Sequence, residues 1–297
     1  EEDYHKGAGS PHAEALVLKK AGKSAKGSTL YVNLEPCCHT NKRTPPCTEA
    51  IIRAGIKKVV AAIIDPNPQV CGKGLRQLKE AGIEVLYGIL KEDAKKLNEA
   101  YIKYITTGLP LVTLKIAMSL DGKIALPSGE SKWITSEKSR MLVQKMRASS
   151  DAILTAIGTV KADNPLLTVR IPSAHSPIRV VIDPELEISL DAKILQTPPK
   201  TILVTSNKKS KKIDEIYNMG TEIMFYTNKL RLRWLMKMLA KKGITSVIVE
   251  GGSGLSSYLL NEKIVDKVVF FIAPIIIGGK DSYPAIGGIS CGRLKDA

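Results

Sequence analysis

Three potential metal ligands in the first fifty residues constrain the fold most, because ligands of one ion must meet in space. His12 lies in the segment Pro-His-Ala-Glu, Cys37 follows a proline, and Cys47 follows a pair of prolines. Imidazole nitrogen and thiolate sulfur are the ligands that zinc prefers, and three protein ligands leave the fourth tetrahedral position for water. The spacing therefore predicts a zinc site on His12, Cys37 and Cys47.

Glu14, two residues after His12, is the predicted catalytic group of this site. A carboxylate that is not a ligand can take a proton from water and return it to a leaving amine. His-x-Glu followed by Pro-Cys and a further cysteine is typical of zinc-dependent nucleobase deaminases. A structural zinc knuckle, or merely buried cysteine and histidine, is the alternative. A structural site usually has four protein ligands and needs no carboxylate beside the histidine.

The composition is that of an ordinary globular protein. With 297 residues, of which 44% are hydrophobic and 25% charged, we expect one large or two medium domains. No run of eighteen apolar residues occurs, so we expect no membrane contact. Five cysteines, two of them in the metal pattern, are too few for a disulfide framework, and we expect a cytoplasmic location.

The net charge of +15, from 44 basic and 29 acidic residues, invites a nucleic-acid interpretation. However, the lysines are scattered in pairs along the chain, and aromatic residues make up only 5% of it. No aromatic side chains alternate with the lysines, as a base-stacking surface requires. We therefore expect solvated lysine-rich faces and no nucleic-acid partner. A deaminase that acts on a base in tRNA or DNA remains the alternative function.

Alternating strands and helices predict an α/β fold with parallel strands. In the first half we expect helices at 13–23, 47–54, 75–81 and 92–107 and strands at 29–34, 58–64 and 83–86. A break at Gly108-Leu109-Pro110 predicts a boundary between domains 1–108 and 109–297. In the second half we expect helices at 136–148, 230–240 and 255–260 and strands at 111–117, 152–155, 178–182, 201–205, 222–225, 245–249 and 265–277.

The last buried strand of the second half leads into the glycine-rich turn Glu250-Gly251-Gly252-Ser253-Gly254 and then into a helix. Glycines let backbone N–H groups approach an anion, and the helix dipole favours negative charge there. The pattern predicts a phosphate cradle, but it is weak by itself, because it is not the dinucleotide-binding fingerprint and many such turns are only turns.

Nine residues separate Cys37 from Cys47, and the last four are Arg43-Thr44-Pro45-Pro46. This long loop resembles the deaminase domain of the bifunctional riboflavin-biosynthesis enzymes. The family usually has glycine before the basic residue, whereas this chain has Lys42 and a loop one residue longer. Segments 119–122, 131–135 and 162–170 resemble the reductase domain of the same enzymes, which has a dihydrofolate-reductase-like fold and uses NADPH.

The resemblance implies site residues for both halves. Contacts to NADPH are implied for Ala117, Trp133, Thr159, Asp163, Gly252, Ser253, Gly254, Leu255, Ser256, Ser257 and Tyr258. Contacts to the substrate are implied for His5, His39, Arg43 and Asn67 in the deaminase half and for Lys115, Ser131, Leu167, Arg170 and Glu250 in the reductase half. The alternatives are that Trp133 is plain core and that Asp163 and Arg170 form a surface pair.

The resemblance also implies the fold and the reactions. We expect a cytidine-deaminase-like zinc domain of α/β/α layers, followed by a dihydrofolate-reductase-like α/β domain. The first would deaminate 2,5-diamino-6-ribosylamino-4(3H)-pyrimidinone 5′-phosphate, and the second would reduce its ribosyl group to ribityl with NADPH. Such deaminase domains have a helix and two strands before the His-Ala-Glu motif, so we expect this domain to lack its N-terminal part and the reductase domain to lack its C-terminal end.

The remaining expectations concern partners. The partner would be a small phosphorylated pyrimidine, and the protein would form a homo-oligomer. A third candidate, a non-catalytic nucleotide-binding protein that has kept both folds, is disfavoured by Glu14 and the complete set of metal ligands.

Overall fold

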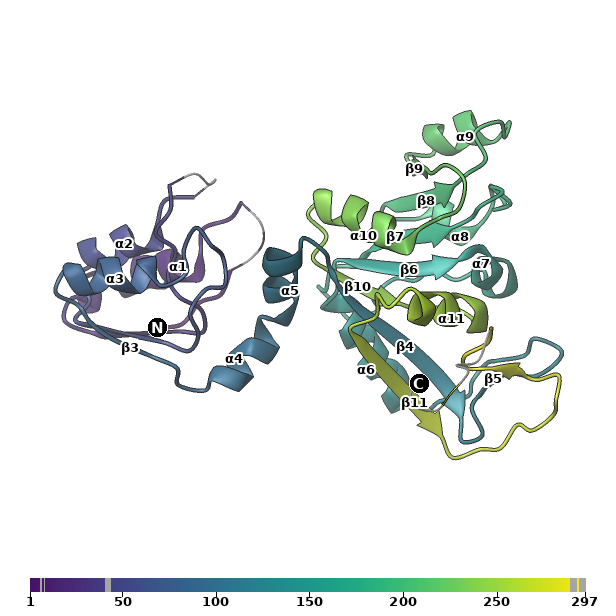
Figure 1. Cartoon of the computed structure of the whole chain (residues 1–297), viewed down its shortest axis with the longest axis horizontal. Coiled ribbons are helices and arrows are strands. Elements are labelled where there is room, and N and C mark those ends of the chain that lie inside the picture. The colour runs from purple at the N-terminus through teal and green to yellow at the C-terminus, as the bar shows by residue number, and fades with distance from the viewer. Residues whose placement is uncertain (6, 8, 41–43, 289–292, 294–297) are drawn as a thin grey trace. The chain divides into compact units, whose positions relative to one another are not determined.

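The computed structural model describes residues 1–5, 7, 9–40, 44–288 and 293 (Figure 1). They form two compact units, Glu1–Gly108 and Leu109–Ala297. Both units are α/β with parallel strands, and this confirms the predicted fold class. In the part of the chain that the structure describes, no helix is long and apolar enough to cross a membrane.

The sheet of the first unit has three parallel strands in the order β1–β2–β3. These strands are β1 (Thr29–Val32), β2 (Lys58–Ala61) and β3 (Glu84–Tyr87). Its helices are α1 (Ala13–Ala21), continued by a 3-10 turn (Gly22–Ala25), and α2 (Cys47–Arg53), α3 (Lys73–Glu80), α4 (Lys91–Leu97) and α5 (Glu99–Thr107). Ile51 of α2 and Leu78 of α3 are fully buried in one cluster with Val59 of β2. Helices α2 and α3 therefore pack on the sheet and fix the ends of the loops that precede them.

The single helix expected at 92–107 is wrong, because Asn98 divides it into α4 and α5. Asn98 has φ −103° and ψ 13°, outside the helical region, and its Nδ2 donates to the carbonyl of Ala94 at 2.8 Å. Asparagine side chains compete in this way with the backbone bonds of a helix.

The main sheet of the second unit has seven parallel strands in the order β11–β4–β10–β6–β7–β8–β9. The strands are β4 (Leu111–Ser119), β6 (Ala152–Ala156), β7 (Ile178–Ile182), β8 (Thr201–Thr205), β9 (Glu222–Phe225), β10 (Ser246–Val249) and β11 (Lys267–Ala273), and an antiparallel pair is formed by β5 (Lys123–Ala125) and β12 (Tyr283–Pro284). The strands expected at 178–182, 201–205 and 222–225 are confirmed residue for residue. Apart from Arg179 in β7 and Glu222 in β9, they consist of β-branched and other apolar residues, as is typical of buried parallel strands.

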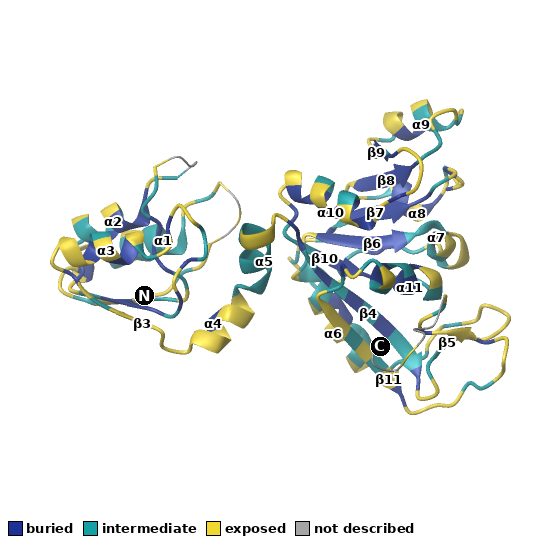
Figure 2. Ribbon diagram, viewed as in Figure 1, coloured by how far each residue is buried: buried dark blue, intermediate teal, exposed yellow. Residues whose placement is uncertain are grey.

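Helices cover both faces of this sheet. They are α6 (Glu137–Ala148), α7 (Ile157–Asp163), α8 (Lys193–Gln196), α9 (Ile213–Asn218), α10 (Leu232–Lys241) and α11 (Ser253–Asn261). Leu235 of α10 and Leu259 of α11 are buried on one face with Leu154 of β6, whereas Ile194 of α8 and Ile216 of α9 are buried on the other. Figure 2 shows the central strands as the most deeply buried part of the unit.

Helix α6 begins one residue after the predicted start, because Ser136 is its cap and its hydroxyl accepts a hydrogen bond from the N–H of Ser139 at 3.3 Å. Helix α7 was not predicted. Its sequence contains glycine and β-branched residues, which are poor helix formers, so packing of Val160 against the sheet must stabilise it. This helix carries Thr159 and Asp163, two of the residues with an expected role at the cofactor.

Candidate active sites

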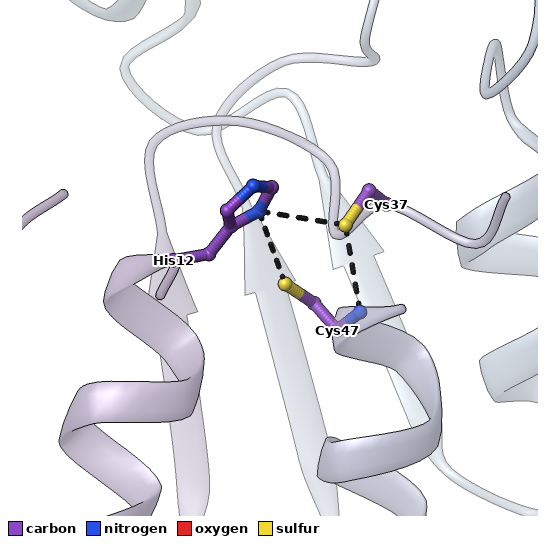
Figure 3. A group of neighbouring side chains, drawn as sticks. All are labelled: His12, Cys37 and Cys47. Carbon is purple, nitrogen blue, oxygen red and sulfur yellow. Dashed lines mark hydrogen bonds between the residues drawn. The ribbon is translucent and has the colours of Figure 1, made fainter. Parts of the chain in front are cut away.

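The three predicted zinc ligands converge in the first unit (Figure 3). The Nδ1 atom of His12 lies 3.5 Å from the Sγ of Cys37 and 3.3 Å from the Sγ of Cys47, and the ligand atoms of all three lie within 4.8 Å of one another. A tetrahedral zinc ion with bonds of about 2.0 Å to nitrogen and 2.3 Å to sulfur holds those atoms about 3.5 Å apart. The donor set and its spacing therefore fit one zinc ion.

Helix ends position these ligands. His12 is the residue before α1, and Cys47 is the first residue of α2, where the helix dipole favours a thiolate. The backbone N–H of Cys47 also donates to the Cys37 sulfur at 3.4 Å. Cys37 is 6% exposed and Cys47 1% exposed, so both sulfur atoms are shielded from bulk water, while His12 is half-buried.

Glu14 lies in the first turn of α1, beside this group. Loss of solvation on burial raises the pKa of its carboxyl above the ordinary value and outweighs a backbone hydrogen bond that lowers it. The Cys37 sulfur raises this pKa further. A raised pKa makes the Glu14 carboxylate a stronger base than an ordinary glutamate.

The residues expected to bind the substrate in the deaminase half differ from one another in their surroundings. The ring of His5 lies 5.1 Å from the ring of His12, centroid to centroid, which places it beside the zinc ligands. His39 follows the cysteine segment, and its buried Nδ1 has no hydrogen-bond partner among the described residues. Asn67 lies in the turn after β2, where its N–H donates to Asp65 at 2.8 Å. Arg43 lies outside the described residues.

In the second unit, Lys115 and Glu250 form an ion pair across neighbouring strands. Strand β10 pairs with β4 so that Val249 lies opposite Leu114, which brings the next residue, Glu250, beside Lys115. The Lys115 Nζ lies 2.8 Å from Glu250 Oε2. Glu250 directly follows the carboxyl end of β10, and Lys115 lies beside it at the middle of the longer strand β4. In open α/β sheets, ligands bind beyond the carboxyl ends of the strands.

Arg147 completes this site, and the sequence analysis missed it. From α6, its Nε donates to Glu250 Oε1 at 2.6 Å and its Nη2 donates to Glu250 Oε2 at 3.1 Å, while Nη1 donates to the carbonyl of Thr168. Burial alone would raise the pKa of Glu250, but Lys115 and Arg147 outweigh it and hold this pKa at about 2. A general rule could have pointed to Arg147: a buried carboxylate such as Glu250 requires cationic partners.

The N-terminus of α11 fits the phosphates of a dinucleotide. No side chain caps this nine-residue helix within the described ranges, and a Cβ built on Gly252 or Gly254 would meet no heavy atom within 4 Å. Backbone N–H groups there can bind an anion. Further along, Leu255, Ser256 and Ser257 are buried, and the Tyr258 hydroxyl donates to the carbonyl of Leu230. Within the expected range 252–258, the first three residues are therefore the most open to a ligand.

The structure excludes a core position for Trp133 and a pair of Asp163 with Arg170, and it shows Asp163 in a surface ion pair with another residue. Trp133 is 65% exposed, so it is not part of the core, and the Arg140 guanidinium lies 4.6 Å from its ring centroid. Asp163 pairs with Lys132 at 2.9 Å, not with Arg170. Arg170 is exposed, and its N–H donates to the Gln144 side chain at 2.8 Å.

The remaining expected residues lie on separate elements of the second unit. Ala117 is near the end of β4, Thr159 is half-buried on α7, and Ser131 is half-buried in the segment before α6. Leu167 is buried, with a φ of 52°. Two of them lie close to the carboxyl ends of parallel strands, Ala117 within β4 and Thr159 three residues after β6.

Comparison with known proteins places the chain in a family. Residues 110–296 match the family described as the RibD C-terminal domain, and residues 2–63 match the zinc-binding region of cytidine and deoxycytidylate deaminases. The riboflavin biosynthesis protein RibD of Aquifex aeolicus is 46% identical over 276 residues, which are 93% of this chain and 77% of that protein. The chain belongs to the RibD family.

Solved structures of family members agree over almost the whole chain. RibD of Acinetobacter baumannii superposes with a TM-score of 0.88 at 40% identity, covering 99% of this chain and 81% of that one. A diaminohydroxyphosphoribosylaminopyrimidine deaminase/5-amino-6-(5-phosphoribosylamino)uracil reductase of Thermotoga maritima superposes at 0.85, with 36% identity, covering 96% of this chain and 79% of that one.

As a RibD family member, the chain unites a zinc-dependent deaminase with an NADPH-dependent reductase of riboflavin biosynthesis. The match over residues 110–296 accounts for the second unit, which a nucleic-acid deaminase leaves unexplained. The comparisons thus support the bifunctional enzyme and give no support to the alternative.

Proposed function

We propose that the first unit hydrolyses the C2 amine of 2,5-diamino-6-ribosylamino-4(3H)-pyrimidinone 5′-phosphate with Glu14 as its proton carrier. The observation that carries this proposal is the convergence of His12, Cys37 and Cys47 beside that carboxyl. Zinc held by these three side chains supplies the Lewis acidity that lowers the pKa of a water molecule. Glu14 accepts the proton of the attacking water and donates it to the departing amine, and its raised pKa favours the first of these steps.

The neighbours of the zinc ligands hold the pyrimidine. His5 lies against His12, and His39 offers a buried ring nitrogen without a protein partner in the described ranges. Asn67 is held in place by its bond to Asp65. We assign these side chains, together with Arg43, to binding of the phosphorylated pyrimidine.

The second unit reduces the ribosyl group of the deaminated product to ribityl. Bound NADPH supplies the hydride, and the protein supplies the alignment. Lys115 and Glu250 orient the sugar, and their ion pair supports the assignment, because it keeps two opposite charges fixed beside the carboxyl end of β10. Ser131, Leu167 and Arg170 hold the phosphorylated substrate.

The N-terminus of α11 and the exposed ring of Trp133 would hold the cofactor. The residues that we assign to NADPH are Ala117, Trp133, Thr159, Asp163 and the range Gly252–Tyr258. Within that range the backbone of Gly252, Ser253 and Gly254 binds the phosphates, because these residues precede or begin a helix that no side chain caps in the described part of the chain.

We further propose that the protein acts in the cytoplasm, as a homo-oligomer, on a small phosphorylated pyrimidine and without a nucleic-acid partner. The scattered lysine pairs support the absence of a nucleic-acid surface. Edge strand β11 exposes 44% of Phe270 and 54% of Ile272, and these apolar side chains offer a surface for a second copy. Light scattering after size exclusion measures the oligomeric state directly.

Incubation of the purified chain with the diaminopyrimidine phosphate, followed by mass spectrometry, tests the proposed order of reactions. Without NADPH we expect only the deaminated product, and with NADPH we expect the deaminated and reduced product. Recovery of unchanged substrate under both conditions, from protein that contains stoichiometric zinc, would contradict the proposal.

A further inference from the structure

Glu35 is a buried carboxylate that the two active sites described above do not use. It is 2% exposed and lies two residues before the zinc ligand Cys37. Its Oε2 accepts the backbone N–H of Asp65 at 3.0 Å and that of Gly72 at 2.8 Å, and its Oε1 accepts the N–H of Leu75 at 3.1 Å. Three bonds from backbone donors to one carboxylate make a strong and well-directed set.

These donors belong to two separate segments of the chain. Asp65 ends the segment after β2, whereas Gly72 and Leu75 belong to the start of α3. Gly72 precedes the helix with φ 83° and has no side chain with which to cap it. Glu35, 37 residues before Gly72 in the chain, takes the place of the missing cap. Its hydrogen bonds therefore link the segment that carries Cys37 to the start of α3.

Close packing presses the same segment against α3. A Cβ on Gly74 would lie 2.1 Å from the carbonyl oxygen of Pro36, a distance that no side chain tolerates. Glycine at this position therefore lets the backbone just before Cys37 lie directly on the helix. The hydrogen bonds of the Glu35 carboxylate and the contact of the Pro36 backbone with Gly74 together fix the position of this segment on α3.

Helix α3 also reaches the segment of the other zinc thiolate. Thr48, the residue after Cys47, donates its N–H to the carbonyl of Cys37 at 3.2 Å and its hydroxyl to Gln77 of α3 at 2.7 Å. Both sulfur ligands are thus held against one rigid element.

A second branch of the network leads to the expected substrate residue Asn67. The Asp65 carboxylate accepts the N–H of Asn67 at 2.8 Å and the hydroxyl of Tyr101, from α5, at 2.9 and 3.1 Å. Because Glu35 accepts the N–H of Asp65, it fixes the position of this turn relative to the segment that carries Cys37.

We propose that Glu35 is a positioning residue of the deaminase site, which sets the place of Cys37 for the metal and, through Asp65, that of Asn67 for the pyrimidine. This inference rests on the zinc site proposed above. Removal of a group that orients a metal ligand typically weakens metal binding about 10–100-fold. Loss of a carboxylate that merely stabilised the fold would lower the melting temperature and leave the metal affinity unchanged.

The test compares Glu35→Gln with Glu49→Gln in the full chain. Glutamine keeps the shape of Glu35 but turns an N–H₂ group toward at least one of the three N–H donors. Glu49 is the matched control, because it is exposed and lies two residues from Cys47, as Glu35 lies two residues from Cys37. Zinc affinity is measured by competition with a chromogenic chelator, and ligand geometry by the thiolate-to-metal absorption of the Co²⁺-substituted protein.

We expect Glu35→Gln to bind zinc about 10–100-fold more weakly than the parent, with a changed Co²⁺ spectrum, and Glu49→Gln to match the parent. Parent-like zinc affinity and Co²⁺ spectrum in folded Glu35→Gln would overturn the positioning role. If that variant does not fold, Glu35→Asp decides: it keeps the charge but withdraws the carboxylate, and parent-like zinc binding by it would equally refute the inference. Absence of zinc binding by the parent chain would instead refute the proposed zinc site.

Discussion

Glu14 in the first unit and Glu250 in the second are glutamates with opposite shifts of pKa. Around Glu14, loss of solvation and the Cys37 sulfur raise the pKa of the carboxyl. Glu250 is more deeply buried, yet Lys115 and Arg147 hold its pKa at about 2. Burial therefore decides the direction of the shift for Glu14, whereas for Glu250 two cationic partners outweigh burial.

This difference matches the two chemistries. Deamination needs a group that accepts and releases a proton, and a raised pKa makes the Glu14 carboxylate a stronger base for the first step. Hydride transfer takes its reacting group from the cofactor, so the protein needs fixed charges that align the sugar. With its pKa held at about 2, Glu250 is ionised at neutral pH. Four substitutions test the contrast with Glu14.

The largest effect is expected for Cys47→Ser. Loss of a buried thiolate should remove the zinc and abolish deamination, while reduction of the deaminated substrate continues, because the two sites lie in separate compact units. Elemental analysis and separate assays of the two reactions check this. Stoichiometric zinc in the variant would show that Cys47 is not a ligand.

Glu14→Gln should keep its zinc and lose deamination by a factor of about 10²–10⁴, the usual contribution of general acid–base catalysis. Glutamine is nearly isosteric with glutamate but cannot take up a proton. Steady-state rates, normalised to the zinc content, give the factor. Deamination at the parent rate would make Glu14 a structural residue.

Glu250→Gln should destabilise the second unit by about 3–5 kcal/mol, because it leaves Lys115 and Arg147 without their counter-charge. The folded-state pKa of about 2 lies below the ordinary unfolded value of about 4.3. The stabilisation is therefore fully present above about pH 4.3 and is lost as the pH falls toward 2.

Urea titrations at several pH values measure this dependence. Tryptophan fluorescence is a specific probe, because both tryptophans, Trp133 and Trp234, lie in the second unit. The difference in unfolding free energy between parent and variant should shrink on acidification below pH 4.3. A difference that does not change with pH would mean that Glu250 is not held ionised.

The smallest effect is expected for Lys115→Met, which removes one of the two cations and keeps the other. The pKa of Glu250 should rise from about 2 toward its ordinary value near 4.3, because burial then opposes a single cation. NMR titration of ¹³C-labelled glutamate carboxyls follows this change. An unchanged pKa would assign the whole effect to Arg147.

The two sites also differ in how far sequence alone could predict them. The zinc ligands carry their chemistry in their residue types and lie within 36 residues, between His12 and Cys47, so the motif identified them. Arg147 and Glu35 escaped prediction, because an isolated arginine or glutamate has no pattern until the fold brings it to a partner. Likewise, apolar periodicity predicts one continuous helix where Asn98 divides it into two. The side-chain hydrogen bond of Asn98 is seen only in the structure.

Separate assays of both reactions on Glu14→Gln and Glu250→Gln test the central claim most directly. Each variant receives the diaminopyrimidine phosphate without NADPH, and separately the deaminated pyrimidine with NADPH, and mass spectrometry quantifies the products. The account predicts that Glu14→Gln reduces at the parent rate but does not deaminate, and that Glu250→Gln deaminates at the parent rate but does not reduce. Normal deamination by zinc-loaded Glu14→Gln, or normal reduction by folded Glu250→Gln, would contradict it.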